Sequence, residues 1–208
     1  QEVYDNLDNG QQTDIIVIDF RTAFDNVDHN KLIHKLNKLG VHPLIVRWIG
    51  SFLKGRSQKV VVDGCTSDTL PVLSWVPLGS VLGPCLFLAY INDLPDCIKS
   101  KARLFADDTI VYLTVKSSSD STTLQNDLHA LEHWERDWSM EFIPEKCEVL
   151  RITRKRKPLI FPYTLHNIKL NTTDAAKYLG VTISKDLNWS SHINNTTSKA
   201  TNSLRFIK

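Results

Sequence analysis

The stretch "LFADDTIVYL" at residues 104–113 places two adjacent aspartates, Asp107 and Asp108, between apolar and β-favouring residues. Successive side chains of a strand point to opposite faces, so an unbroken strand would bury one of the two carboxylates. An unpaired buried charge is costly. A tight turn between strands 103–106 and 109–114 avoids that cost, because both carboxylates can then lean toward the same end. The stretch therefore predicts a β-hairpin that carries two carboxylates at its turn.

A third carboxylate ends the run "DIIVIDF" at residues 14–20, which predicts a short buried strand finishing at Asp19. If this strand lies beside the hairpin, three carboxylates meet at one end of a sheet. Neighbouring negative charges repel unless a cation lies between them, and magnesium prefers oxygen ligands of this kind. Two such ions about 4 Å apart can stabilise both oxygens of an in-line phosphoryl displacement. The residues alone leave plain turn chemistry open for Asp107-Asp108, because Asp is common in turns.

The composition is that of a globular domain with a core, since 42% of the 208 residues are hydrophobic and 23% are charged. A net charge of +2 does not by itself indicate a nucleic-acid partner. The chain has no apolar run of about 18 residues and no signal-type start, so we expect neither a membrane segment nor secretion. The sequence has no initiator methionine, since Met140 is its only methionine, so we expect a fragment of a longer protein. The cysteines show neither CxxC pairing nor zinc-site spacing, so we expect reduced, buried thiols at Cys65, Cys85, Cys97 and Cys147.

Helical and strand patterns mix without strict βαβ alternation, which predicts an α+β fold. The predicted helices cover residues 32–39, 42–55, 85–94 and 120–138 and a stretch that begins near 190. The predicted strands, besides those named above, lie within residues 147–153, 163–170 and 175–184. A further hairpin is expected around Asp63-Gly64.

Five blocks in a fixed order carry a family resemblance: "DIIVIDFRTAFDNVDH", "VPLGSVLGPCLFLAYINDLPD", "LFADDT", "WSMEFIPEKCEVLRIT" and "AAKYLGVTIS". Together they resemble the reverse transcriptase domain of non-LTR, LINE-type retrotransposons, close to the jockey group. The resemblance implies the palm of a right-hand polymerase with partial fingers and the start of a thumb. Residues 1–187 would form the palm, with a fingers-side hairpin near 56–75, and residues 188–208 would begin a thumb helix. The chain would be truncated at both ends.

The same resemblance implies an RNA-directed DNA polymerase that joins a dNTP to a DNA primer on an RNA template, with its point of action in the nucleus. Two Mg²⁺ ions, or Mn²⁺ in their place, would be held by Asp19, Asp107, Asp108 and the backbone carbonyl of Phe20. Phe24 would pack under the incoming sugar and exclude a 2′-hydroxyl, since steric exclusion needs only a rigid wall.

The second block departs from the family pattern, which usually reads G-V-P-Q-G-S. Leu78 stands where a Gln helps to position the nucleotide, and Leu cannot make that hydrogen bond. Trp75 replaces a Gly, which tolerates backbone angles that Trp does not. Gly79 remains where the backbone approaches the nucleotide. In the fourth block, Ile143 replaces the usual Asn.

Three further assignments follow from the resemblance. Lys146 fits the candidate general acid for pyrophosphate, although a solvated lysine is an equally open interpretation. Tyr178-Leu179-Gly180 resembles the turn that grips the primer end. Arg154 and Arg156, in the basic run "RKRKP", either contact the phosphates of primer or template or form a solvated loop.

Two functions of different classes remain open on the sequence. The first is a working polymerase module, which the three intact aspartates favour. The second is a catalytically decayed or truncated palm remnant with at most nucleic-acid binding, which Trp75 and Leu78 favour. The sequence leaves the oligomeric state open.

Overall fold

The computed structural model describes residues 1–72, 74–77 and 79–207, so Leu78 lies outside the described residues. The chain forms two compact units. The first consists of residues 1–19, 95–132 and 142–208, and the second of residues 20–94 and 133–141. All three aspartates that the sequence assigns to metal binding belong to the first unit.

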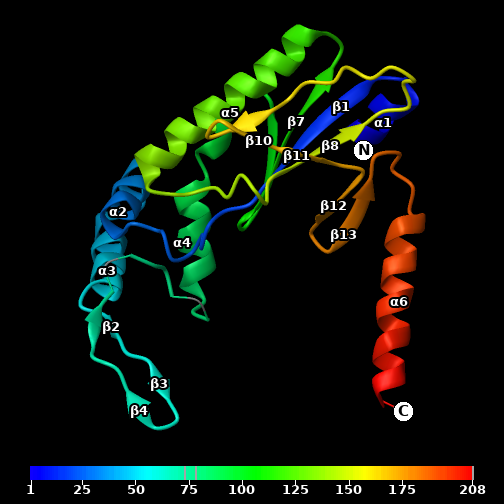
Figure 1. The fold of residues 1–208 in the computed structure, drawn as a ribbon. Helices are drawn as coiled ribbons and strands as arrows, with labels where there is room; N and C mark the ends of the chain where they lie inside the picture. The colour runs from blue at the N-terminus through cyan, green and yellow to red at the C-terminus, as the bar shows by residue number, and fades with distance from the viewer. Residues whose placement is uncertain (73, 78, 208) are drawn as a thin grey trace. The chain divides into compact units, whose positions relative to one another are not determined.

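A five-stranded sheet forms the centre of the first unit (Figure 1). Its strands, in spatial order, are β11 (Asn171–Thr173), β8 (Glu148–Ile152), β1 (Gln12–Ile18), β7 (Asp108–Val115) and β6 (Lys101–Phe105). Neighbouring strands are antiparallel except for β11 and β8, which are parallel. The central strand β1 is therefore hydrogen-bonded along both of its edges.

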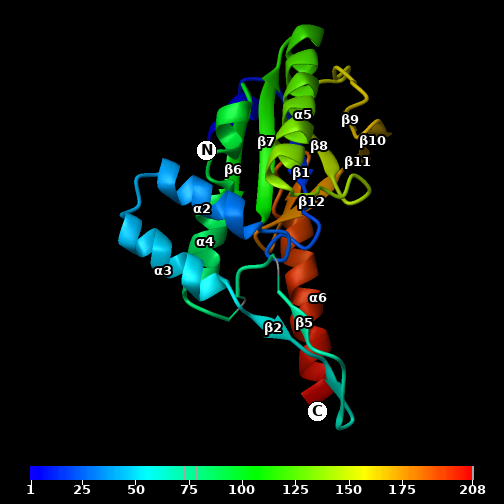
Figure 2. The same ribbon diagram turned by 90° about the vertical axis from the view of Figure 1, so that its left-hand side faces the viewer.

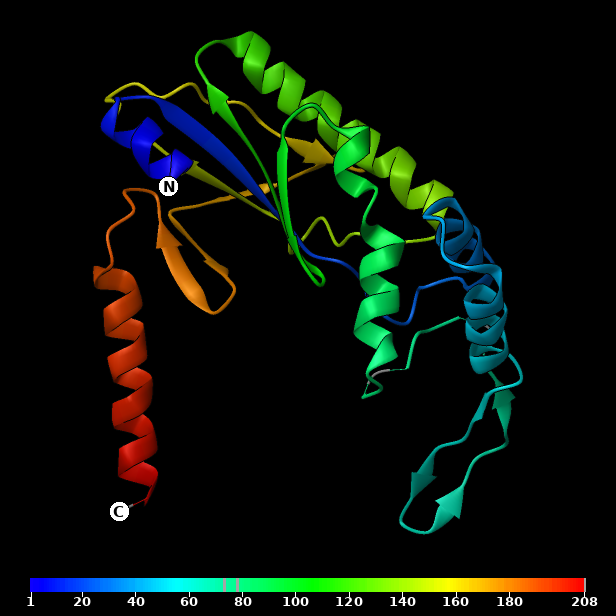
Figure 3. The same cartoon turned by 180° about the vertical axis from the view of Figure 1, so that it is seen from behind.

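The two faces of this sheet are covered by different elements. Ile15, Tyr112 and Leu150 pack on one face against Leu7 of helix α1 (Glu2–Asp8) and against the β12–β13 hairpin. That hairpin consists of strands Ala175–Tyr178 and Val181–Ser184. Helix α5 (Ser118–Trp138) lies on the opposite side of the sheet (Figures 1 and 3). Burial on both faces explains why the second half of β1, residues 15–18, is an unbroken apolar run.

The one acidic residue inside β1, Asp14, is fully buried and held by a polar network. Its carboxylate accepts hydrogen bonds from Gln12 Nε2 and from the Tyr163 hydroxyl, each at 2.9 Å. Arg151 Nε lies 3.3 Å from Oδ1. Burial raises the pKa of Asp14, while the hydrogen bond from Gln12 and the charge of Arg151 act in the opposite direction. The network attaches the segment after β8 to the sheet.

Two smaller elements complete the first unit. Strands β9 (Thr164–Leu165) and β10 (Ile168–Lys169) form a short hairpin. Helix α6 (Ser190–Ile207) follows β13, where the backbone N–H of Thr182 donates to His192 Nδ1 at 3.3 Å. No helix among the described residues is long and apolar enough to cross a lipid bilayer.

The second unit contains three complete helices, the last residues of α5 and a long β-hairpin (Figure 2). The helices are α2 (His29–Lys38), α3 (Pro43–Leu53) and α4 (Leu82–Ile91). The hairpin carries two short ladders, β2 (Ser57–Gln58) with β5 (Leu70–Pro71) and β3 (Val61–Val62) with β4 (Cys65–Thr66). The short 3₁₀ helix η1 (Leu94–Cys97) leads back to the first unit.

The structure confirms the predicted α+β fold and corrects three details. Asp108 is not in the hairpin turn but opens β7 opposite Phe105, so the turn is Ala106-Asp107. Helix α1 was not predicted. The expectation of buried thiols is wrong for three of the four cysteines, because Cys147 is buried while Cys65, Cys85 and Cys97 are exposed.

A buried lysine holds the second unit together. Lys35 of α2 is 4% exposed, and its Nζ lies 2.6 Å from Asp93 Oδ1 and donates to the Tyr90 carbonyl. The ammonium also lies 3.6 Å from the ring centroid of Trp138 and 5.1 Å from that of Trp134. A desolvated cation over aromatic faces gains more than an exposed one, so this cage joins α2 to the end of α5.

Replacing Lys35 by Met should lower the free energy of unfolding by about 3 kcal/mol, because it leaves Asp93 without its cation in a largely buried site. Urea unfolding followed by tryptophan fluorescence measures the loss. The matched control is Lys38→Met on the same helix, where the side chain is exposed and the change should stay within about 0.5 kcal/mol. Equal losses in the two variants would contradict the role of the cage.

Candidate active site

The strand register brings Asp19 and Asp108 to the same end of the β1–β7 ladder. The last pair of that ladder is Ile18 with Thr109, and Asp19 and Asp108 are the next residues of the two segments. The turn between β6 and β7 consists of Ala106 and Asp107, and Ala106 has φ = 51°. Asp107 directly precedes Asp108, which is the first residue of β7. The three carboxylates predicted to act together thus lie at one end of the sheet, on two adjacent strands.

The backbone of Asp19 is held on both sides by the segment before β8. Its N–H donates to Cys147 Sγ at 3.5 Å, and its carbonyl accepts from the N–H of Ile143 at 2.9 Å. Cys147 is fully buried, and its own N–H donates to the carbonyl of Ile143. The contact from Ile143 uses only its backbone, so the replacement of the family's usual Asn leaves this hydrogen bond intact. Sequence reasoning missed the role of Cys147, which a lone cysteine does not signal.

Lys146 lies at the same end of the sheet. Its Nζ is 3.8 Å from Asp19 Oδ1, and the side chains are 63% and 43% exposed, respectively. An exposed pair at this distance contributes little to stability. The contact places the positive charge of Lys146 beside Asp19 at this end of the sheet.

The turn between β12 and β13 also approaches this end. Tyr178 is half-buried, and burial raises the pKa of its hydroxyl, with the negative charge of Asp108 adding to the shift and Arg103 opposing it. Leu179 and Gly180 both have positive φ, 49° and 81°, as the two-residue hairpin turn requires. The structure therefore brings Tyr178 within electrostatic reach of Asp108, with Leu179-Gly180 at the tip beyond it.

Arg154 and Arg156 are not brought to the aspartates. They follow the end of β8 at which Ile152 pairs with Thr13, whereas Asp19 follows the other end of β1. Thr13 and Asp19 are six residue steps apart along extended chain, which corresponds to about 20 Å. Arg154 instead pairs with Asp8, at 3.0 Å between Nη1 and Oδ1. The location of these arginines favours the alternative of a solvated basic loop.

The remaining predicted site residues belong to the second unit. Phe24 stacks on Phe87 of α4, with ring centroids 4.4 Å apart and planes inclined at 24°. Phe20 has a buried side chain that meets Trp134 edge-on, at 6.5 Å between centroids. Gly79 has φ = 86°, a conformation that a side chain would strain. Leu78, the other predicted nucleotide contact, lies outside the described residues.

Trp75 occupies a backbone conformation suited to glycine, with φ = 92°. Its N–H donates to the Val27 carbonyl at 3.0 Å, and its carbonyl accepts from His29 Nε2 at 2.9 Å. The guanidinium of Arg56 lies 4.9 Å from the indole centroid. A non-glycine residue held at such an angle costs roughly 1–3 kcal/mol. The prediction that a Gly at this place supplies backbone freedom agrees with this geometry.

The start of α4 depends on a close approach at Gly83. Ser80 Oγ donates to the Pro77 carbonyl at 2.8 Å and accepts from the Gly83 N–H at 3.0 Å. A Cβ at Gly83 would lie 2.3 Å from the Pro77 oxygen, which real contacts do not allow. A glycine is therefore required at position 83, where the Pro77 carbonyl approaches the start of α4.

Replacing Gly83 by Ala should destabilise the protein by about 1–3 kcal/mol, because the methyl group overlaps backbone. Chemical denaturation measures the effect. Gly50→Ala in α3 is the matched control, since its Cβ would meet only Ile33 Cδ1 at 3.7 Å. That substitution should raise stability by as much as about 1 kcal/mol through helix propensity. A stable Gly83→Ala variant would refute the close approach.

The donor chemistry at the end of the sheet suits a hard divalent cation, because Asp19, Asp107 and Asp108 offer carboxylate oxygens. All three side chains are accessible to solvent. Among residues 1–72, 74–77 and 79–207, no three His, Cys, Asp or Glu side chains converge closely enough to hold a metal ion. The three carboxylates thus fit a metal by donor type, but in the described part of the chain they do not converge as ligands.

Comparison with known proteins identifies the family. The family model described as "Reverse transcriptase (RNA-dependent DNA polymerase)" matches residues 3–183. The RNA-directed DNA polymerase from mobile element jockey of Drosophila melanogaster is 34% identical over 188 residues, 86% of this chain. The probable RNA-directed DNA polymerase from transposon BS of the same species is 31% identical over 201 residues, 92% of this chain.

The fold agrees with this match. The apo telomerase of Candida tropicalis, truncated from its C-terminal domain, superposes with a TM-score of 0.58 at 13% identity, covering 89% of this chain and 37% of that one. The chain belongs to the reverse transcriptase family, as the sequence resemblance predicted. It spans only 20% and 22% of the lengths of the jockey and BS polymerases.

Proposed function

We propose that the chain is the palm-centred part of an RNA-directed DNA polymerase of a non-LTR retrotransposon. The observation that carries the proposal is that Asp19 and Asp108 lie directly beyond the last pair of the β1–β7 ladder, Ile18 with Thr109, while Asp107 lies in the turn before Asp108. Membership of the reverse transcriptase family and the names of the jockey and BS relatives support it. We assign residues 1–187 to the palm, with a fingers-side hairpin near 56–75, and residues 188–208 to the start of a thumb helix.

The proposed reaction joins a dNTP to the 3′ end of a DNA primer paired with an RNA template. The primer 3′-oxygen forms a bond to the α-phosphorus, the bond to the bridging oxygen of pyrophosphate breaks, and the 3′-hydroxyl proton passes to solvent water. Asp19, Asp107, Asp108 and the Phe20 carbonyl would bind two Mg²⁺ ions, or Mn²⁺ in their place. Bound there, these ions would supply charge stabilisation for the attacking and leaving oxygens.

The other residues have proposed roles around that centre. Lys146, 3.8 Å from Asp19, would give a proton to the departing pyrophosphate. The turn Tyr178-Leu179-Gly180 would hold the primer end. Phe24 would bar a ribose 2′-hydroxyl by its bulk, and Gly79 would let the backbone approach the nucleotide. We place the point of action in the nucleus, by the family resemblance alone.

A second candidate is a palm that keeps its fold but has lost catalysis. One observation favours it, namely the strained backbone of Trp75 at φ = 92° in the loop where the family usually has Gly. Substitution of the nucleotide-contacting Gln by Leu78 points the same way. The two candidates make different predictions for metal binding and for primer extension.

The metal site is tested with Mn²⁺, whose free ion is counted by electron paramagnetic resonance. The full chain should bind Mn²⁺, and Asp19→Asn and Asp107→Asn should each weaken binding by about tenfold or more, because a lost charge–charge contact is worth at least 1.5 kcal/mol or so. Asp63→Asn is the control, since Asn suits its hairpin turn and φ of 50° equally well. If the control and the site variants bind Mn²⁺ alike, the aspartates are not the ligands.

Catalysis is tested by primer extension on a homopolymer RNA template with Mg²⁺. The proposal predicts elongation that Asp108→Asn reduces by about 10²-fold or more, because removing one preorganised charged group from an active site typically costs that much. Asp63→Asn should extend the primer as the parent chain does. Retained Mn²⁺ binding without any elongation would favour the decayed palm.

A further inference from the structure

Positive charge is concentrated in one stretch of the second unit. Residues 29–62 contain seven Lys and Arg residues and no Asp or Glu, which gives this stretch a formal charge of +7. The rest of the chain has 18 Lys and Arg against 23 Asp and Glu, a formal charge of −5. The stretch forms α2, α3 and the first arm of the long hairpin. A surface with charge of one sign attracts ligands of the opposite sign.

A hollow of about 340 Å³ lies between α2 and α3, which are side by side in Figures 1 and 2. Its apolar lining residues are Ile33, Pro43, Val46, Gly50 and Leu53. The two helices approach closely at Gly50, where a Cβ would lie 3.7 Å from Ile33 Cδ1. The hollow has the size of a small-ligand site, since such pockets range from about 300 to 1,000 Å³.

The polar side chains around this hollow are basic or neutral: His29, Asn30, Asn37, Arg47, Ser51 and Lys54. None of its described lining residues is acidic. The side chains of Arg47 and Lys54 are exposed, and neither charged group has an ion pair or hydrogen bond with another described residue. Their backbones are seven residues apart along α3, which corresponds to about 10 Å. Two cations without a counter-charge therefore border one small hollow.

These donors define the class of ligand. The guanidinium of Arg47 is a fork that fits two oxygens of an anion, and the ammonium of Lys54 is a compact point charge. The Asn37 amide donates to the Ile33 carbonyl and has a second N–H to give. A phosphate group offers three strong acceptor oxygens and up to two negative charges, more than a carboxylate does. Linked phosphates can thus contact both cations and satisfy the neutral donors as well.

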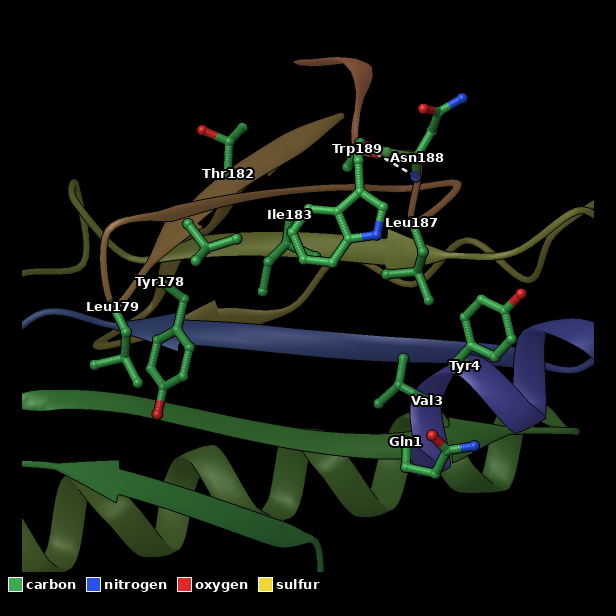
Figure 4. A pocket seen from close by; sticks show the side chains of 12 residues that line it. Gln1, Val3, Tyr4, Tyr178, Leu179, Thr182, Ile183, Leu187, Asn188 and Trp189 are labelled. Carbon is green, nitrogen blue, oxygen red and sulfur yellow. Dashed lines mark hydrogen bonds between the residues drawn. The ribbon is translucent and has the colours of Figure 1, made fainter. Parts of the chain in front are cut away.

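Two other places in the first unit lack this combination. The hollow beside Tyr178 and Leu179, shown in Figure 4, has no Lys or Arg side chain among its described lining residues. The end of the sheet that carries Asp19, Asp107 and Asp108 is acidic, so without a divalent cation it repels a phosphate. Binding of a phosphate anion in metal-free solution is therefore expected at the groove between α2 and α3.

We propose that the hollow between α2 and α3 is a binding site for an anion with two or more linked phosphate groups. Arg47 would bind one phosphate through its fork, Lys54 would neutralise another, and the Asn37 amide would donate to an oxygen. Linked phosphates occur both in free polyphosphates and in the backbone of a nucleic-acid strand, and the experiment separates these two sources. The inference uses no residue of the candidate active site, so it does not rest on the proposed polymerase function.

Binding is measured by isothermal titration calorimetry of the full chain with sodium tripolyphosphate in metal-free buffer. Saturable binding of one anion per chain is expected. Arg47→Gln should weaken the affinity by about tenfold or more, because it removes a bidentate, charge-assisted contact. Arg47→Lys keeps the charge but loses the fork, so it should weaken binding less than Arg47→Gln does. Lys54→Gln should weaken it by about threefold or more.

Lys38→Gln is the matched control, because Lys38 is an exposed cation of α2 that does not line the hollow. At about 0.15 M salt, charges farther than about 8 Å are largely screened, so this variant should bind tripolyphosphate within about twofold of the parent chain. Citrate, which carries carboxylates instead of phosphates, should bind at least about tenfold more weakly than tripolyphosphate. Circular dichroism of each variant verifies that the fold is intact.

A short single-stranded RNA, titrated in the same metal-free buffer, distinguishes the two sources of phosphate. If Arg47→Gln and Lys54→Gln weaken the affinities for RNA and for tripolyphosphate by equal factors, the groove takes the backbone of a strand. If they weaken the affinity for tripolyphosphate alone, the groove takes a free polyphosphate. Both results support a phosphate site.

Three results would overturn the proposal. The first is a parent chain that shows no saturable binding of tripolyphosphate. The second is an affinity that Arg47→Gln leaves unchanged, or that Lys38→Gln reduces equally, since either would indicate diffuse attraction by the basic stretch. The third is citrate binding as tight as that of tripolyphosphate, which would assign the groove to a carboxylate-bearing partner. Because the titration needs neither metal nor elongation, its failure is separable from failure of the polymerase function.

Discussion

The pairing of β1 on both edges is the constraint on which the proposed active site depends. Strands β7 and β8 fix its register from two sides, and burial of both faces removes any alternative alignment. A slip of one residue would exchange the faces on which Asp14 and Ile15 lie, moving the carboxylate out of its network and into the apolar cluster. Asp19 is the first residue beyond this strand, so its place at the same end of the sheet as Asp108 follows from the register. The two backbone contacts to Cys147 and Ile143 then hold it there.

Much of the fold could be predicted because its signals are local. A few neighbouring residues suffice to recognise the apolar run that ends at Asp19, the Asp63-Gly64 turn and the Asp107-Asp108 hairpin. The misses have non-local causes. Helix α1 is seven residues long and mostly polar, and it is stabilised by the docking of Leu7 on the sheet, which no local pattern reveals. The exposure of three cysteines is likewise decided by tertiary packing.

The candidate site divides in the same way. The positions of Asp19, Asp107 and Lys146 were predicted from family motifs and from strand order. In the structure, Lys146 Nζ lies 3.8 Å from Asp19 Oδ1. The basic run after β8 was harder to interpret, because a charge pattern does not say at which end of a sheet it emerges. The register shows that Arg154 leaves at the end away from the aspartates and pairs with Asp8. The hydrogen bond from Asp19 to a buried thiol could not be predicted from spacing at all.

The way Asp19 is held bears on how this sequence can diverge. The hydrogen bond from Ile143 to Asp19 is donated by the backbone N–H, which every residue except proline has, so almost any residue at position 143 could make it. Position 83 is the opposite case, because the close approach of the Pro77 carbonyl leaves no room for a side chain, not even a methyl group. A sequence comparison counts a substitution at position 143 and one at position 83 alike. The substitution at 143 leaves the contact to Asp19 intact, whereas the substitution at 83 disrupts the turn before α4. Among copies of such a chain, the residue at position 83 is therefore a better indicator than the residue at 143 of whether the fold around the site has been retained.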